Sequence, residues 1–266
     1  MIDLFNRVIY LADMKLILIL IISLSFFVTT NAELHHPGTG SFIETGALQT
    51  RAVYGYKVNT FYGVPKFDYG DFSIEGFRSN YNLISSDFIK IGPLLSYNFK
   101  PYDQGDIDHL SEMDRSGFFE VGLLTSISLP FGQLFLQQSK ALHDSPGYNY
   151  KASFGTGIPL YKTAKSNIWL NIMLEYAFIS SNTSNYLFGV NESEVTKTRP
   201  QFTSTRSKLF TSIWGLWTPL AGNWWINATY KIDKFNKEII SSPIVRRRVD
   251  STLMIGLMYS FGNLNK

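Results

Sequence analysis

The chain has 266 residues, a net charge of +3 and 45% hydrophobic residues. This composition excludes a disordered chain and gives no electrostatic reason to expect a nucleic-acid partner. Cysteine is absent, so disulfides, thiolate metal sites and cysteine nucleophiles are excluded.

The first segment, residues 1–32, has the organisation of a signal peptide. Lys15 precedes the apolar run LILILIISLSFFV, and Ala32 supplies the small residue expected at a cleavage site. The run is shorter than the roughly 20 apolar residues of a membrane-spanning helix, although a membrane anchor is the alternative interpretation. We therefore expect export, with residues 33–266 forming the mature barrel domain. Met14 is a second candidate start.

Most of the remaining chain alternates apolar and polar residues with a period of two, as strands with two different faces do. Residues 148–158 show this most clearly, with Tyr, Ala, Phe, Thr and Ile alternating with Asn, Lys, Ser and Gly. Segments of about ten residues suit a tilted membrane-spanning strand better than a globular strand of about five or six. Aromatic pairs near segment ends, such as Tyr176–Phe178, suit the interface girdles. The sequence thus predicts an all-β, transmembrane antiparallel up-and-down β-barrel; a soluble sandwich is the alternative.

About eleven segments are candidate strands: 48–57, 60–67, 71–82, 87–99, 117–129, 132–141, 147–159, 167–180, 207–218, 222–235 and 251–261. Bacterial single-chain barrels have an even number of strands. Either 60–67 merges with a neighbour to give ten strands, or a short strand near Ser41–Thr45 makes twelve. Twelve is the preferred prediction.

The lengths of the connections predict which end of the barrel faces the periplasm, because periplasmic turns are short and extracellular loops long. The expected periplasmic turns are 129–131, 160–166 and 219–222. The expected extracellular loops are 100–116, 181–206 and 236–250.

The last predicted strand carries an apolar stripe at every second residue of Leu253–Phe261, ending in Tyr259-Ser260-Phe261. Such an ending resembles the final-strand signal that the barrel-assembly machinery reads, so this machinery is an expected partner. In the usual signal the aromatic is the last residue, whereas here Gly262–Lys266 follow.

Several segments resemble motifs of the MipA/OmpV family of outer-membrane proteins, also called MltA-interacting proteins. They are YGDFSIEGFRSNYNLISSDF at 69–88, IGPLLSYNF at 91–99, Tyr186–Val190 and Ser242–Val245. Arg78 and Asn80 stand where the family's GxGYNL motif has glycines. The resemblance extends from about Val53 to Phe261.

This resemblance implies a non-catalytic scaffold in the outer membrane. One family member is described as bridging a lytic transglycosylase and a bifunctional penicillin-binding protein, so a murein hydrolase and a murein synthase are expected partners. Other members are linked to adhesion, osmotic stress or antibiotic response. A narrow porin or solute channel, and a surface protein acting in adhesion or stress response through 100–116 and 181–206, remain alternatives.

Few residues offer chemistry. The acidic run Asp103, Asp106, Asp108, Glu112 and Asp114 lacks the spacing and glycine of an EF-hand, so a solvated loop is favoured. His35–His36 suits a flexible terminus better than a metal site. Neither a Ser-His-Asp order nor a catalytic carboxylate pair stands out. No catalytic residue, cofactor or metal site is predicted.

Two sets of charged residues are candidate sites. Six lie on the polar faces of predicted strands and should point into the lumen, as a structural network or along a narrow water path: Lys90, Glu120, Lys151, Glu175, Lys231 and Asp233. Arg246, Arg247 and Arg248 lie in an expected extracellular loop. Arginine binds phosphate in a bidentate manner, so lipopolysaccharide is a candidate ligand; a solvated charge run is the alternative.

Overall fold

The computed structural model describes residues 40–99, 101, 108–113, 115–143, 146–162 and 167–262. The expected signal peptide lies outside these residues. The strands are β1 (Ser41–Arg51), β2 (Lys57–Tyr69), β3 (Phe72–Glu75), β4 (Arg78–Tyr81), β5 (Ile84–Ser85), β6 (Ile89–Asn98), β7 (Phe118–Leu129), β8 (Gly132–Leu142), β9 (Tyr148–Lys162), β10 (Asn167–Ile179), β11 (Ser207–Pro219), β12 (Trp224–Phe235) and β13 (Val249–Gly262). The helices are η1 (Asp108–Leu110), α2 (Ser181–Phe188), η2 (Glu192–Glu194) and α3 (Lys237–Ile240).

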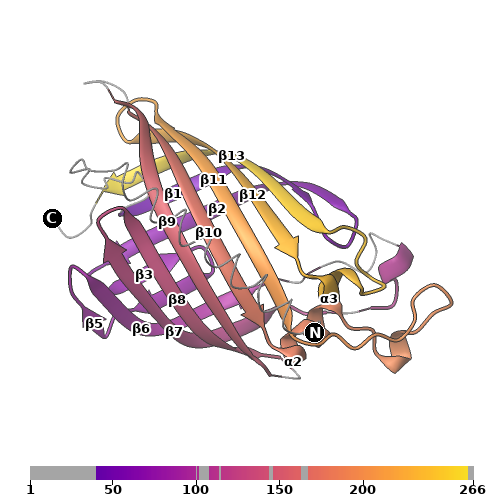
Figure 1. Ribbon diagram of the computed structural model, residues 1–266. Helices are drawn as coiled ribbons and strands as arrows, with labels where there is room; N and C mark the ends of the chain where they lie inside the picture. The colour runs from indigo at the N-terminus through magenta and orange to yellow at the C-terminus, as the bar shows by residue number, and fades with distance from the viewer. Residues whose placement is uncertain are drawn as a thin grey trace, which may run out of the picture. The chain divides into compact units, whose positions relative to one another are not determined.

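The strands form one antiparallel sheet that closes on itself as a barrel (Figure 1). Sequential strands are neighbours, β1 pairs with β13, and the pairing of β4 with β6 closes the ring. The short β5 continues β4 along the same edge of β6, so the closed wall has 12 strands. The predicted fold and the preferred strand number are confirmed.

The twelfth strand arises elsewhere than expected. The segments predicted near Ser41–Thr45 and at 48–57 form one strand, β1, because the chain turns at 52–56, where the Ala52 amide donates to the Tyr56 carbonyl at 2.9 Å. The segment predicted as one strand at 71–82 is instead the hairpin of β3 and β4. Gly76 turns this hairpin with a φ of 57°, a conformation that costs glycine little.

The β3–β4 hairpin is short, so the barrel wall beside β2 is lower there than at the neighbouring strands. β3 pairs with β2 only from Lys66 to Tyr69. Within the described part of the chain, Lys57–Val64 has a strand partner on the β1 side alone. Lys57 therefore stands clear of strands on its other side and is exposed.

The two faces of the wall differ as the alternation predicts. Outward side chains such as Trp214 and Ile255 are 44% and 51% exposed, whereas lumen-facing Thr211 and Asn227 are 3% and 2% exposed. This sorting places an apolar surface against lipid and polar groups inside. No helix among the described residues is long and apolar enough to cross a membrane.

The long connections gather at one end of the barrel. Figure 1 shows α2 and α3 at one end and the β5–β6 connection at the other. The turns 130–131 and 220–223 are short and lie at the end where β1 begins and β13 ends. By the length rule for outer-membrane barrels, this end is periplasmic and the end with α2 and α3 is extracellular.

A row of small residues lets one aromatic side chain lie across the lumen wall. Gly46 pairs with Tyr62 on one side and with Gly256 on the other. The Tyr62 hydroxyl donates to the carboxylate of Glu44. A Cβ added at Gly256 would meet the Tyr62 hydroxyl and lie 2.8 Å from Glu44 Oε1. Glycine is therefore required here for side-chain packing rather than for its backbone freedom.

We expect Gly256→Val to destabilise the barrel by about 1–3 kcal/mol, the usual cost of overpacking. The measurement is the temperature at which the barrel loses its compact migration in unheated-sample electrophoresis. Gly63→Ala is the matched control, because a Cβ there would meet only the Glu44 carbonyl oxygen at 3.9 Å. Equal melting of both variants would contradict the packing role of the glycine row.

Candidate functional site: the loop cap, the lumen and the cationic rim

The connections at the extracellular end fold together into a packed unit, the loop cap, which comprises the described residues 52–56, 108–113, 180–206 and 236–248. Its buried apolar side chains come from all four segments and the end of β12: Val53, Tyr54, Leu110, Met113, Phe188, Val190, Phe235, Ile239, Ile244 and Val245. Full burial of one such side chain contributes roughly 1.5–3 kcal/mol before conformational entropy is counted. The cap is therefore held by a core of its own.

A buried ion pair fastens the cap to the chain just before β7. Arg115 donates from Nη2 to Glu194 Oε2 at 2.8 Å and from Nη1 to Oε1, and its Nε donates to the Tyr186 carbonyl at 2.6 Å. The carboxylate also accepts from the Asn191 amide at 2.8 Å. Burial alone would raise the pKa of Glu194. The bonds from Arg115 and Asn191 outweigh burial and hold the pKa of this carboxyl below its ordinary value.

A second arginine joins two cap segments through backbone carbonyls. Arg199 is 2% exposed, and its Nε donates to the Glu194 carbonyl at 2.7 Å. Its Nη1 donates to the carbonyls of His109 and Ser111 at 2.9 and 3.0 Å. Burial and the nearby charge of Arg246 lower the pKa of His109. The cap thus holds two buried guanidinium groups and a histidine that favours its neutral form.

Two of the family-like motifs meet inside the cap. Ser242 Oγ donates to the Phe188 carbonyl at 2.6 Å, which joins Ser242–Val245 to Tyr186–Val190. Val190, Ile244 and Val245 share the apolar core. These motif residues therefore build the interior of the cap and are not an exposed recognition loop.

The charged residues predicted for the lumen occupy lumen-facing positions of β6, β7, β9, β10 and β12: Lys90, Glu120, Lys151, Glu175, Lys231 and Asp233. The structure brings Lys231 and Asp233 together, with Nζ 2.8 Å from Oδ2. Glu120 instead accepts from the Asn149 amide at 2.6 Å. Within the described residues, Lys90, Lys151 and Glu175 form no ion pair. Among these six residues, the ion pair that the structure shows joins two residues of the same strand, β12.

Other lumen groups carry no obvious sequence signal. Arg78 of β4 lies within electrostatic reach of Glu75 and of Glu175. Both polar atoms of the buried Asn171 amide lack a protein partner among the described residues. A buried amide without a protein partner is expected to bond to water, so this part of the lumen is polar. The contacts of Arg78 and Asn171 depend on which strands are neighbours, which a single sequence does not show.

The three arginines predicted as a lipopolysaccharide contact are all exposed. The amides of Arg246 and Arg247 donate to the Val53 carbonyl at 2.9 and 3.0 Å, which seats this segment on the β1–β2 turn. Three further exposed cations stand at the same strand ends. Together these six residues are named the cationic rim: Arg51, Lys57, Lys234, Arg246, Arg247 and Arg248.

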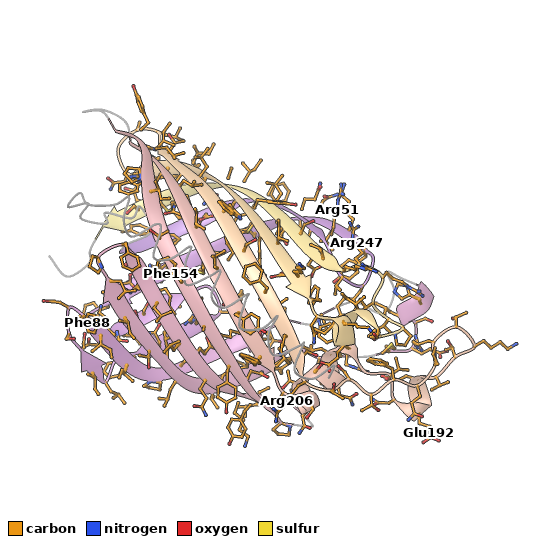
Figure 2. The ribbon with its side chains drawn as sticks, in the orientation of Figure 1. Arg51, Phe88, Phe154, Glu192, Arg206 and Arg247 are labelled. Carbon is orange, nitrogen blue, oxygen red and sulfur yellow. The ribbon has the colours of Figure 1, made fainter. Side chains whose placement is uncertain are left out.

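Strand pairing explains how the cationic rim assembles. Arg51 pairs with Lys57 across β1 and β2, and Lys234 pairs with Val249 across β12 and β13. The Phe235 amide reaches the carbonyl of Arg248 at 3.4 Å. Figure 2 shows Arg51 and Arg247 together at the same end of the strands. Sequence reasoning found only the contiguous arginines, because the other three cations come from separate strands.

Metal binding finds no support in the described part of the chain, where no group of three or more His, Cys, Asp or Glu side chains could hold an ion. The side chains of Asp103, Asp106, Asp108 and Asp114 and the pair His35–His36 lie outside what the structure describes.

We expect Glu194→Gln to loosen the loop cap while leaving the barrel intact. Removing one partner of a buried ion pair costs about 3–5 kcal/mol, because the other charge remains buried and uncompensated. Limited trypsin digestion should then cut at Lys197 and Arg206 much faster than in the parent protein. The double variant Glu194→Gln with Arg115→Met should recover part of the protection. Unchanged digestion of the single variant would contradict the role of this ion pair.

Acid should also loosen the cap. The pKa values of His109 and Glu194 are lowered in the folded protein, so the open cap binds more protons than the closed cap as the pH falls. Their contribution is complete above the ordinary values of 6.5 and 4.5 and is lost as the pH falls through the lowered values. The opening constant of amides in 180–206, which is the observed exchange rate divided by the intrinsic rate at each pH, should rise below about pH 6.5 and again in stronger acid. An opening constant that does not change with pH would exclude this coupling.

Residues 45–261 match the family described as MltA-interacting protein MipA. Outer membrane protein Omp26La of Vibrio anguillarum is 25% identical over 163 residues, which are 60% of this chain and 62% of that protein. Outer membrane protein OmpV of Vibrio cholerae serotype O1 is 25% identical over 182 residues, which are 66% and 68% of the two chains. The chain thus spans about 62% of the length of Omp26La.

Solved structures with a similar trace include OmpTdeltaL8, a loop-deletion mutant of an outer membrane protein of Vibrio cholerae, with a TM-score of 0.36, 8% identity and coverage of 82% of this chain and 97% of that one. The CymD monoaromatic hydrocarbon channel gives a TM-score of 0.33, 9% identity and coverage of 89% and 94%. Scores this low carry no argument, and the fold rests on the strand pairing. The family match covers nearly the whole barrel, and the chain is therefore an outer-membrane protein that belongs to the MipA family.

Proposed function

We propose that this protein is a non-catalytic outer-membrane scaffold that docks a peptidoglycan-remodelling enzyme, a lytic transglycosylase or a penicillin-binding protein, on its periplasmic side. The observation that carries the proposal is the match of residues 45–261 to a family whose description is MltA-interacting protein. The name of the family supports a role in binding a protein partner. The two ends of the barrel differ in their connections, and this difference suggests where a partner would bind.

At the extracellular end, the loop cap is a packed unit. The apolar core and the bonds from Arg115 and Arg199 tie its segments together. A partner in the periplasm meets the opposite end of the strands, where Figure 2 places Phe88. Docking would therefore use the connections at that end.

One of these connections suits a docking role, the periplasmic segment formed by residues 82–88. Leu83, Ile84 and Phe88 are 71%, 55% and 59% exposed. The backbone is nevertheless fixed, since the amides of Leu83 and Ser86 donate to the carbonyls of Ile91 and Ile89, each at 2.9 Å. A fixed backbone loses little entropy on binding, which makes the apolar side chains that it carries effective anchors. The alternative role for such side chains is contact with the membrane interface.

A photo-crosslinking amino acid placed at Leu83 or Phe88 in cells tests the proposal directly. We expect a murein hydrolase or synthase among the crosslinked products identified by mass spectrometry. The same label at Lys197, which is exposed in the loop cap, is the matched control and should not capture the enzyme.

Leu83→Ser with Phe88→Ser should reduce co-purification of that enzyme at least tenfold, since buried interface anchors each contribute more than about 1 kcal/mol. Leu220→Ser is the control, because Leu220 is 57% exposed in a different periplasmic turn. If the crosslinks contain no more murein enzyme than those of another abundant barrel, the scaffold proposal is wrong. Single-channel conductance in planar bilayers would then test the narrow-channel alternative.

A further inference from the structure

The wall of the barrel sorts charge by face. Among the described strand residues, every acidic side chain occupies a lumen-facing position: Glu44, Asp68, Glu75, Glu120, Glu175, Asp233 and Asp250. The described outward-facing charges are all basic and stand at the extracellular ends of their strands: Arg51, Lys57, Lys140, Lys208 and Lys234. The charges on the outer surface of the described strands are therefore positive and lie at one level.

The cationic rim is the densest part of this positive level. Its six side chains are exposed, and no ion pair involving them occurs in the described part of the chain. Asp250 of β13 feels the charge of Arg247, but it lies on the lumen side. Glu238 of α3 is exposed and accepts from the side-chain amide of Asn236 at 3.0 Å. The rim thus keeps its positive charge available to an external anion.

Below the rim, the outward surface of β12 and β13 is apolar apart from Ser251; below Arg51 and Lys57 the next outward residues are Gln49 and Asn59, whose side chains bond to each other. On β12 and β13 the outward positions beneath Lys234 and Val249 are occupied by Tyr230, Leu253 and Ile255, which are 44%, 43% and 51% exposed. Such a stripe faces lipid acyl chains. Cations at its upper end are therefore at the level of the lipid headgroups, where a ligand would combine phosphates with acyl chains.

Aromatic and cationic side chains also combine at this level outside the rim. Lys140 Nζ lies 6.0 Å from the centre of the Tyr148 ring, and Lys208 Nζ lies 5.5 Å from the centre of the Phe178 ring. Tyr148 and Phe178 are 54% and 43% exposed. Aromatic rings of this kind sit at the membrane interface, which places the cations beside them at the phosphate level.

We propose that the cationic rim is a binding site for the phosphates of lipopolysaccharide in the outer leaflet, with the acyl chains lying along the apolar stripe of β12 and β13. Arginine suits this ligand because its planar guanidinium binds phosphate through two parallel hydrogen bonds. The backbone amides of Arg246 and Arg247 bond to the Val53 carbonyl, and the carbonyl of Arg248 accepts from the Phe235 amide. With the three cations fixed by strand ends, these arginines form a preorganised anion site. This site is independent of periplasmic docking and acts at the other end of the barrel.

Titration of the lipopolysaccharide-free barrel in detergent micelles with bisphosphorylated lipid A, followed by native mass spectrometry, tests the proposal. We expect Arg247→Gln with Arg248→Gln to weaken binding about 30-fold, which corresponds to about fivefold for each surface cation removed. The independent variant Arg51→Gln with Lys57→Gln should weaken it by a similar factor. The control Lys197→Gln with Arg206→Gln removes the same charge from exposed sites and should bind as the parent does; Figure 2 shows Arg206 well apart from Arg51 and Arg247.

Two further probes identify the source of the phosphate. Dephosphorylated lipid A should bind far more weakly than the bisphosphorylated form; equal binding would mean that the acyl chains alone direct the interaction and would overturn the proposal. Millimolar inorganic phosphate should not displace lipid A, and full displacement would indicate a site for free anions instead. An equal loss in the control variant would also overturn it. Arg247→Lys with Arg248→Lys should bind more tightly than the glutamine pair but more weakly than the parent, because lysine keeps the charge and loses the bidentate geometry. Unchanged heat-modifiable migration of all variants confirms that the barrel is folded.

Discussion

A backbone amide or carbonyl without a hydrogen-bond partner costs several kcal/mol in the hydrocarbon of a bilayer, and this cost determines the architecture. The sheet meets it by closing through β1–β13 and β4–β6. Closure gives every strand one face toward lipid and one toward the lumen, and the alternation of the sequence follows from that. In the described wall, Lys57–Val64 of β2 is paired with β1 on one side only, beside the short β3–β4 hairpin. The backbone groups on the other side of this stretch therefore need hydrogen-bond partners other than a neighbouring strand.

Because the lipid-facing surface must be apolar, the groups that can recognise another molecule are confined to the lumen, the two ends and the headgroup level. Two buried arginines organise the loop cap from within: Arg115 binds Glu194 of η2, and Arg199 binds the Ser111 carbonyl. The family-like motifs at Tyr186–Val190 and Ser242–Val245 are part of the same interior. Among the described residues, we therefore propose the periplasmic segment and the cationic rim, whose three arginines belong to the cap, as the exposed binding sites.

The wall was largely predictable, since a period of two is a local property of each strand. This period predicted which side chains face lipid and which face the lumen, including the apolar stripe at Leu253–Phe261. The long loops are the segments between the alternating stretches. The hairpin at 72–81 was missed because one glycine, Gly76, decides between one long strand and two short ones. The cap contacts were not predictable, because Arg115 and Glu194 are 79 residues apart. The same holds for the three cations that join the predicted arginines in the cationic rim, because Arg51, Lys57 and Lys234 reach it only through strand pairing.

The sorting of charge between the two faces also explains why the net charge of the chain is a poor guide to its surface. A net charge of +3 gave no reason to expect a nucleic-acid partner. In a closed barrel, however, the strand acids point into the lumen, where Asp233 pairs with Lys231 and Glu120 with Asn149. Removing these acids from the outer surface leaves its cations uncompensated. Arg51 and Lys57 therefore produce a positive field at the headgroup level, although the net charge of the whole chain is small. For membrane recognition, the relevant quantity is the charge on one face of the barrel at one depth in the membrane.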